Sequence, residues 1–132
     1  MSNYKVSYAG KNIQGNLRPR SNTLQKPNVH YTKSPQDFST LLIWDPDAPA
    51  KSYVHWLVIN IPGSQISLGQ EIIPYKPPTP PSGIHRYFVT LYNQRSKIQI
   101  SNQPKREYFN VSAFEKKYGL SKFGEKMVQV SA

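Results

Sequence analysis

The residues of this chain that could do chemistry lie at the ends of apolar segments. Asp45 and Asp47 follow one apolar run, His55 lies near the start of a second, and His85 and Tyr87 open a third. Carboxylates, imidazoles and a phenol can transfer protons, ligate a metal ion or hold a polar ligand. Alternate residues of an extended chain point the same way, so we expect His85 and Tyr87 to share a face.

Each of these residues also has an ordinary structural interpretation. An Asp-Pro pair commonly starts a turn, so Asp45 and Asp47 could be purely structural. A histidine among leucines and isoleucines is more often a core residue than a ligand. The spacing of the aspartates and histidines matches no compact metal motif such as His-Glu-x-x-His, which disfavours a metal site. Without a Gly-x-Ser-x-Gly motif a serine hydrolase has no positive support, and without cysteine a thiol nucleophile is excluded.

Three predicted strands must position these side chains. They are Phe38–Trp44, Tyr53–Ile61 and His85–Asn93, all rich in β-branched and aromatic residues. Both faces of the second segment are apolar, which predicts a strand covered on both sides. If the three strands are neighbours, their ends converge on one pocket rimmed by Pro49 and Pro77–Pro81.

The remaining elements carry weaker signals. Short strands are predicted at Tyr4–Tyr8, Val29–Tyr31 and Met127–Val130. One helix is predicted, with a capping box at Ser112–Glu115 and an end at Gly119. These elements indicate a mainly β fold whose sheet is packed between layers, with one short helix near the C-terminus.

Composition restricts the class of protein. The chain has 132 residues, 17 Lys+Arg against 7 Asp+Glu, and a formal net charge of +10. Its length fits a single domain over residues 1–132. It lacks an apolar run of about 18 residues, which excludes a membrane-spanning helix. Its first residues lack the apolar core of a secretory signal, which favours a cytoplasmic location.

Charge and proline content point to different features. The positive charge suits an anionic partner, but the basic residues are scattered, so a solvated basic surface explains them equally well. Five of the eight residues in Pro74–Pro81 are proline. Such a segment cannot donate to a sheet, and it predicts a stiff extended loop between two strands.

Three motifs in fixed order resemble the phosphatidylethanolamine-binding protein family, which includes animal Raf kinase inhibitor proteins and plant flowering-time regulators. They are Asp45-Pro46-Asp47-Ala48-Pro49, His55-Trp56-Leu57-Val58 and Gly83-Ile84-His85-Arg86-Tyr87, and the similarity covers most of Tyr8–Val130. The resemblance implies a central antiparallel sheet packed against a smaller sheet, and a small anion pocket. By motif position, the pocket residues would be Asp45, Asp47, Tyr53, His55, Pro78, His85 and Tyr87. Longer family members continue past the position of Val130 into a segment that flanks the pocket, so we expect that wall to be missing or replaced.

This resemblance leads us to expect a non-enzymatic module that binds phosphate or a phosphorylated lipid headgroup and modulates a kinase, protease or other signalling partner. A proline-dense rim offers few backbone donors, so the donors would be His55, His85 and the Tyr87 hydroxyl. Asp45 or Asp47 would accept one imidazole N–H and favour the protonated ring. Anion binding would then weaken as pH rises through the histidine range. No cofactor or metal is expected.

Two alternatives from other classes stay open. The same Asp/His/Tyr set could hydrolyse a small ester by acid–base chemistry. The positive charge could instead bind nucleic acid or an acidic membrane directly, which predicts a steep dependence on salt.

Overall fold

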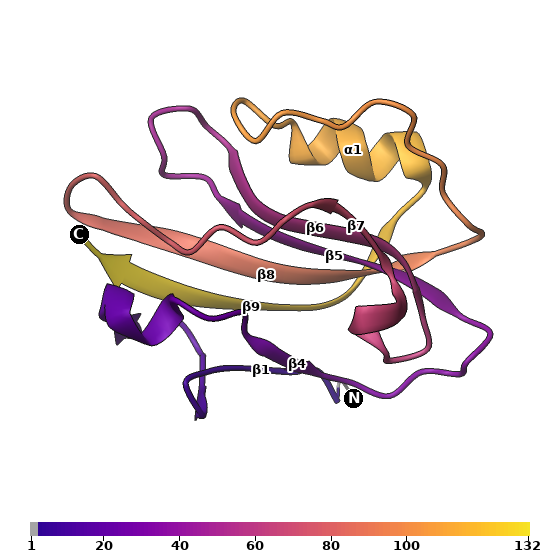
Figure 1. Cartoon of the computed structure of the whole chain (residues 1–132), viewed down its shortest axis with the longest axis horizontal. Helices are drawn as coiled ribbons and strands as arrows, with labels where there is room; N and C mark the ends of the chain where they lie inside the picture. The colour runs from indigo at the N-terminus through magenta and orange to yellow at the C-terminus, as the bar shows by residue number, and fades with distance from the viewer. Residues whose placement is uncertain (1–2) are drawn as a thin grey trace.

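A six-stranded sheet forms the centre of the protein (Figure 1). The computed structural model describes residues 3–132. The three segments with the strongest strand signals lie in the middle of this sheet. In spatial order its strands are β3 (Leu17–Arg18), β9 (Ser121–Ser131), β8 (Ile84–Gln94), β5 (Phe38–Asp45), β6 (Tyr53–Pro62) and β7 (Gln70–Ile73).

The pairing within this sheet is antiparallel except at one edge. β5 pairs antiparallel with both β6 and β8, and β8 pairs antiparallel with β9. The two-residue strand β3 runs parallel to β9, with Leu17 opposite Gln129. The predicted antiparallel sheet is therefore present, with one parallel strand added at its edge.

The two faces of the large sheet are covered by different elements (Figure 1). A three-stranded sheet of β2 (Lys11–Asn12), β1 (Lys5–Tyr8) and β4 (Asn28–His30) covers one face, and helix α1 (Val111–Tyr118) covers the other. Two 3-10 turns, η1 (Arg20–Thr23) and η2 (Ile66–Leu68), lie in the connections. The mainly β fold, with a smaller sheet and one short C-terminal helix, is confirmed.

Successive side chains of the central strands point to opposite faces of the large sheet, and so contribute to a hydrophobic core on each face. Leu41 and Ile43 of β5 pack toward the small sheet, whereas Leu42 between them packs with Phe114 of α1. Six consecutive residues of β6 are buried. The predicted burial of this strand on both faces is therefore confirmed.

The start of α1 differs from the predicted capping box. The helix begins at Val111, and the N-cap is Asn110, whose side-chain oxygen accepts a hydrogen bond of 2.9 Å from the Ala113 N–H. Ser112 lies inside the first turn, so the predicted capping box is wrong. The predicted end at Gly119 is confirmed, since Gly119 has the left-handed φ of 60° that glycine adopts readily.

Strand boundaries differ most where the sequence is polar. The last strand begins at Ser121 rather than at Met127, and the short strand β7 was not predicted. The proline-rich segment Pro74–Pro81 has no regular structure and links β7 to β8, as predicted. Within residues 3–132, no helix is long and apolar enough to cross a membrane.

Candidate anion-binding site

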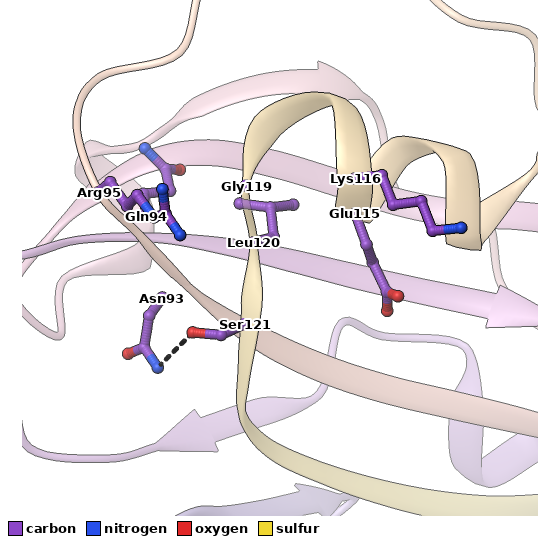
Figure 2. A pocket seen from close by; sticks show the side chains of 8 residues that line it. All are labelled: Asn93, Gln94, Arg95, Glu115, Lys116, Gly119, Leu120 and Ser121. Carbon is purple, nitrogen blue, oxygen red and sulfur yellow. Dashed lines mark hydrogen bonds between the residues drawn. The ribbon is translucent and has the colours of Figure 1, made fainter.

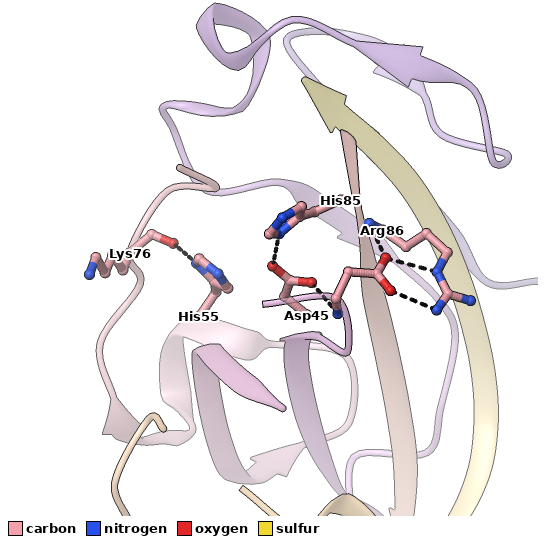
Figure 3. A network of polar contacts seen from close by, with 6 residues as sticks. Asp45, His55, Lys76, His85 and Arg86 are labelled. Atoms are coloured by element: carbon pink, nitrogen blue, oxygen red, sulfur yellow. Dashed lines mark hydrogen bonds and ion pairs between the residues drawn. The ribbon is translucent and has the colours of Figure 1, made fainter. Parts of the chain in front are cut away.

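The order of the strands brings predicted site residues together at one end of the large sheet. Because β5 runs antiparallel between β6 and β8, its last residues lie beside the first residues of both neighbours. Asp45, His55 and His85 come together there (Figure 3). They line a cavity of about 220 Å³, and the complete lining is Asp45, Ala48, Pro49, Tyr53, His55, Lys76, Thr79, Pro80, Pro81, His85 and Tyr87.

A buried carboxylate orients one of the two imidazoles. Asp45 Oδ2 lies 2.7 Å from His85 Nδ1, and both side chains are buried. The other oxygen, Oδ1, accepts a 2.7 Å hydrogen bond from the Asp47 backbone N–H. With Nδ1 donating to the carboxylate, Nε2 of His85 is the nitrogen left for a ligand.

The second imidazole is held by the proline-rich loop instead. His55 Nδ1 lies 2.7 Å from the Lys76 carbonyl oxygen, which can only accept, so Nδ1 carries the proton (Figure 3). Burial lowers the pKa of His55 to about 4. At neutral pH the ring is therefore uncharged, and its Nε2 is a hydrogen-bond acceptor. The expectation that His55 would donate to an anion is wrong under these conditions.

The tyrosines of the cavity play unequal roles. Burial, followed by the Asp45 charge and a hydrogen bond to Asp45, raises the pKa of Tyr87, so the phenol keeps its proton. Its use as a donor to a ligand stays a prediction. The Tyr53 hydroxyl accepts a 2.8 Å hydrogen bond from Lys76 Nζ, and that ammonium lies 5.1 Å from the centre of the Tyr53 ring.

Two predicted site residues are not among those that line the cavity. Asp47 forms a bidentate pair with Arg86, at 2.8 Å from Nη2 and 2.9 Å from Nε. Hydrogen bonds from the Arg86 side chain lower the pKa of Asp47 to about 2. This pair fastens the β5–β6 loop to β8. Pro78 is buried within its loop, and its neighbours Pro80 and Pro81 form the rim.

The site lacks a ready set of metal ligands. Asp45 and His85 bind each other, and His55 Nδ1 is bound to a carbonyl oxygen. Among residues 3–132, no group of three His, Cys, Asp or Glu side chains is placed to hold a metal ion.

Another hollow lies at the C-terminal end of α1 and has a volume of about 380 Å³. Most of its polar side chains bind within the fold: Glu115 accepts a hydrogen bond from Tyr92, and Asn93 donates to Ser121 (Figure 2). Gln94 is bonded to Thr40 and Asn60. The Tyr92–Glu115 bond holds α1 against β8, and the other bonds join β8 to β9, β5 and β6. The histidine-lined cavity is therefore the better candidate site.

The family described as phosphatidylethanolamine-binding protein matches residues 5–129. The chain belongs to this family. "Protein BROTHER of FT and TFL 1" of Arabidopsis thaliana is 42% identical over 107 residues, which cover 74% of this chain and 60% of that protein. The chain thus spans less than two thirds of that relative. "Protein TERMINAL FLOWER 1" of the same plant is 34% identical over 125 residues, covering 87% of this chain and 71% of that protein.

Solved structures show the same fold at low identity. A carboxypeptidase Y inhibitor, in complex with its cognate proteinase, superposes with a TM-score of 0.84 at 19% identity, covering 98% of this chain and 82% of that one. A phosphatidylethanolamine-binding protein of Plasmodium vivax gives a TM-score of 0.76, also at 19% identity, covering 97% and 84%.

Two residues around the cavity were missed by sequence reasoning. Lys76 is the one charged residue in the Pro74–Pro81 run, a signal that could have singled it out. Arg106 gave no local signal, because its role depends on long-range contacts. Its guanidinium donates to the carbonyl oxygens of Val54 at 3.1 Å and Pro74 at 2.7 Å, which fixes the start of β6 against the proline-rich loop.

Proposed function

We propose that this chain is a non-catalytic binding module that holds a phosphate group, or a phosphorylated headgroup, in the cavity between β5, β6 and β8 and modulates a protein partner. The observation that carries the proposal is the buried Asp45–His85 pair at 2.7 Å, in a cavity that Lys76 also lines. The pair orients His85 so that Nε2 is left for the ligand, and Lys76 adds a positive charge to the rim. The family assignment supports the ligand class, and the inhibitor–proteinase complex with the same fold supports a protein partner.

The donors and acceptors in this cavity favour a ligand of mixed character. His85 Nε2 and Lys76 Nζ would donate to phosphate oxygens, whereas neutral His55 offers an acceptor at Nε2. A phosphate that keeps one O–H, or an ammonium attached to the phosphate, would satisfy that acceptor. Phosphoethanolamine combines both features, which makes it the preferred probe.

The lining also supports a role without catalysis. Among the described residues that line the cavity, the hydroxyl groups belong to Tyr53, Thr79 and Tyr87, and none is a serine or cysteine. The phenol of Tyr87, with its raised pKa, is a poor nucleophile.

Calorimetry with phosphoethanolamine and with sulfate tests the proposal. Sulfate stays a dianion across the titration range of histidine, whereas a phosphate ester itself titrates near pH 6. We expect both ligands to bind at about pH 5.5, and sulfate to bind at least tenfold more weakly at about pH 8, because Nε2 of His85 can donate to an anion only while it carries a proton. His85→Ala should lose most of the affinity, and His30→Ala, a change at an exposed histidine outside the cavity, should keep it.

Three results would contradict the proposal. They are sulfate affinity that does not change with pH, binding that survives in His85→Ala, and turnover of phosphoesters or carboxyl esters that vanishes in His85→Ala. The last result would favour the hydrolase alternative.

A further inference from the structure

A second cavity, of about 600 Å³, lies between the small sheet and the β6–β7 edge of the large sheet. Its lining includes Trp56 and Val58 of β6, Ile66 of η2, Glu71 of β7, and Lys26 and Asn28 at β4. None of its lining residues lines the histidine-containing cavity. Its volume falls within the range of about 300–1,000 Å³ that is usual for small-molecule sites.

A carboxylate is fixed at the edge of an indole in this cavity. Trp56 Nε1 donates a 2.7 Å hydrogen bond to Glu71 Oε2, and the Trp56 residue is only 5% exposed. Tyr75 packs edge-on against the same indole, with 5.8 Å between ring centres. The indole is therefore held from two sides, and its hydrogen bond holds the Glu71 carboxylate beside the ring.

The chain's own ammonium group already occupies this position. Lys26 Nζ lies over the Trp56 ring, 5.2 Å from its centre, and 3.5 Å from Glu71 Oε2. The Lys26 side chain is 55% exposed and that of Glu71 is 42% exposed. A pair at this distance and exposure contributes little to stability, so a ligand can displace Lys26 at small cost.

We propose that this cleft binds a small organic ammonium ion, which takes the place of the Lys26 ammonium between the Trp56 ring and the Glu71 carboxylate. An aromatic face attracts a cation through the charge distribution of the ring, and quaternary ammonium groups are common ligands of such faces. The carboxylate supplies the opposite charge. Val58 and Ile66 supply apolar surface for alkyl groups on the nitrogen. This site is independent of the proposed phosphate site.

Nuclear magnetic resonance tests this inference through the indole N–H of Trp56. The chain has two tryptophans, so Trp44→Phe assigns the two indole signals. Choline is the probe, and 3,3-dimethylbutan-1-ol is its uncharged analogue of nearly equal shape. We expect choline to shift the Trp56 signal in a saturable manner at millimolar concentration and to leave the Trp44 signal in place. The uncharged analogue should cause no comparable shift.

Variants separate the contributions. Lys26→Ala removes the resident ammonium, so choline no longer has to displace it. Because an exposed ion pair is weak, we expect choline binding to tighten by only about two- to fivefold. Glu71→Gln keeps an oxygen that can accept from Trp56 but removes the charge, and should weaken binding at least fivefold. Glu107→Gln, at an exposed carboxylate outside the cleft, is the matched control and should not change binding.

The inference is overturned if choline causes no shift, if the uncharged analogue shifts Trp56 as strongly, or if Glu71→Gln and Glu107→Gln bind choline equally. Sulfate carries no ammonium group and reports on the histidine-lined cavity alone, so sulfate binding in Glu71→Gln distinguishes failure at one site from failure at the other.

Discussion

At His55, burial and one hydrogen bond decide what the imidazole can offer. Its Nδ1 proton is directed to the Lys76 carbonyl oxygen, and burial lowers the pKa of His55 to about 4. His85, only two strands away, binds a carboxylate instead. The two histidines of one cavity therefore differ in the group that holds Nδ1 and in what they offer a ligand. Residue types alone do not reveal this difference.

The lowered pKa of His55 has a consequence for stability against pH. Between its usual pKa of 6.5 and about 4, the unfolded chain takes up a proton that the folded chain does not. The free energy of unfolding should therefore fall as pH decreases through this window and stop falling below it, by at most about 3 kcal/mol from this group. Urea unfolding at several pH values measures this change in the free energy of unfolding.

His55→Asn is the informative variant, because its side-chain N–H can replace Nδ1 without titrating. We expect the pH dependence of its stability between pH 4 and 6.5 to be flatter than that of the natural protein. His30→Gln, at an exposed histidine, should leave the slope unchanged. Equal slopes for the natural protein and His55→Asn would show that burial does not suppress the charge.

At the scale of elements, the cap of α1 gives a direct comparison between two nearby residues. Asn110→Ala removes the side-chain oxygen that accepts from the Ala113 N–H, and should lower the free energy of unfolding by about 1 kcal/mol. Ser112→Ala, inside the first turn, should change it by less than about 0.5 kcal/mol. Denaturant unfolding of both variants measures the difference. A larger loss in Ser112→Ala than in Asn110→Ala would support the capping box instead.

The cap shows why some elements could be predicted and others could not. The runs in β5, β6 and β8 are long, apolar and β-branched, and no other local structure suits them. Asn110 and Ser112 are both good capping residues, so local preference alone could not separate them. The first half of β9 is polar and contains Gly124, and it becomes a strand because β8 pairs with it.

In the candidate site, too, the sequence predicted which residues matter but not the long-range contacts between them. The motifs selected Asp45, His55 and His85, and the structure places all three around one cavity. Their convergence depends on β5 lying between β6 and β8, and strand order is not encoded in any local pattern. For the same reason the pairing of Asp47 with Arg86 and the clamp by Arg106 were not predicted.

At the scale of the whole molecule, two sheets approach closely at one glycine. A Cβ added to Gly124 of β9 would lie 2.4 Å from Cγ of Tyr4, whose hydroxyl donates to the Val89 carbonyl oxygen at 2.9 Å. Gly124→Ala should therefore separate the small sheet from the large one locally, and lower the free energy of unfolding by about 1–3 kcal/mol. Thermal and urea unfolding measure the loss.

A double-mutant cycle identifies the cause of that loss. In a Tyr4→Ala background the ring is absent, so adding Gly124→Ala should cost much less than it does alone. Additive losses would mean that the two residues do not compete for the same space.

The distribution of acidic residues affects the field around the molecule. Five of the seven Asp and Glu side chains bind partners within the fold: Asp45, Asp47, Glu71, Glu115 and Glu125. The excess of basic side chains is thus the main charge presented to the surroundings. Such a field speeds the approach of anionic ligands, and added salt screens it.

The position of β9 has a consequence for folding during synthesis. This strand, which is synthesised after the other strands of the sheet, lies between β8 and the much earlier strand β3. The growing chain therefore cannot complete the large sheet until Ser131 has left the ribosome, and β8 keeps an open edge until then. Contacts between residues so far apart in sequence slow folding, and an open edge can pair with other chains. Nascent chains released before β9 is complete should aggregate, a risk that a chaperone could reduce by covering β8.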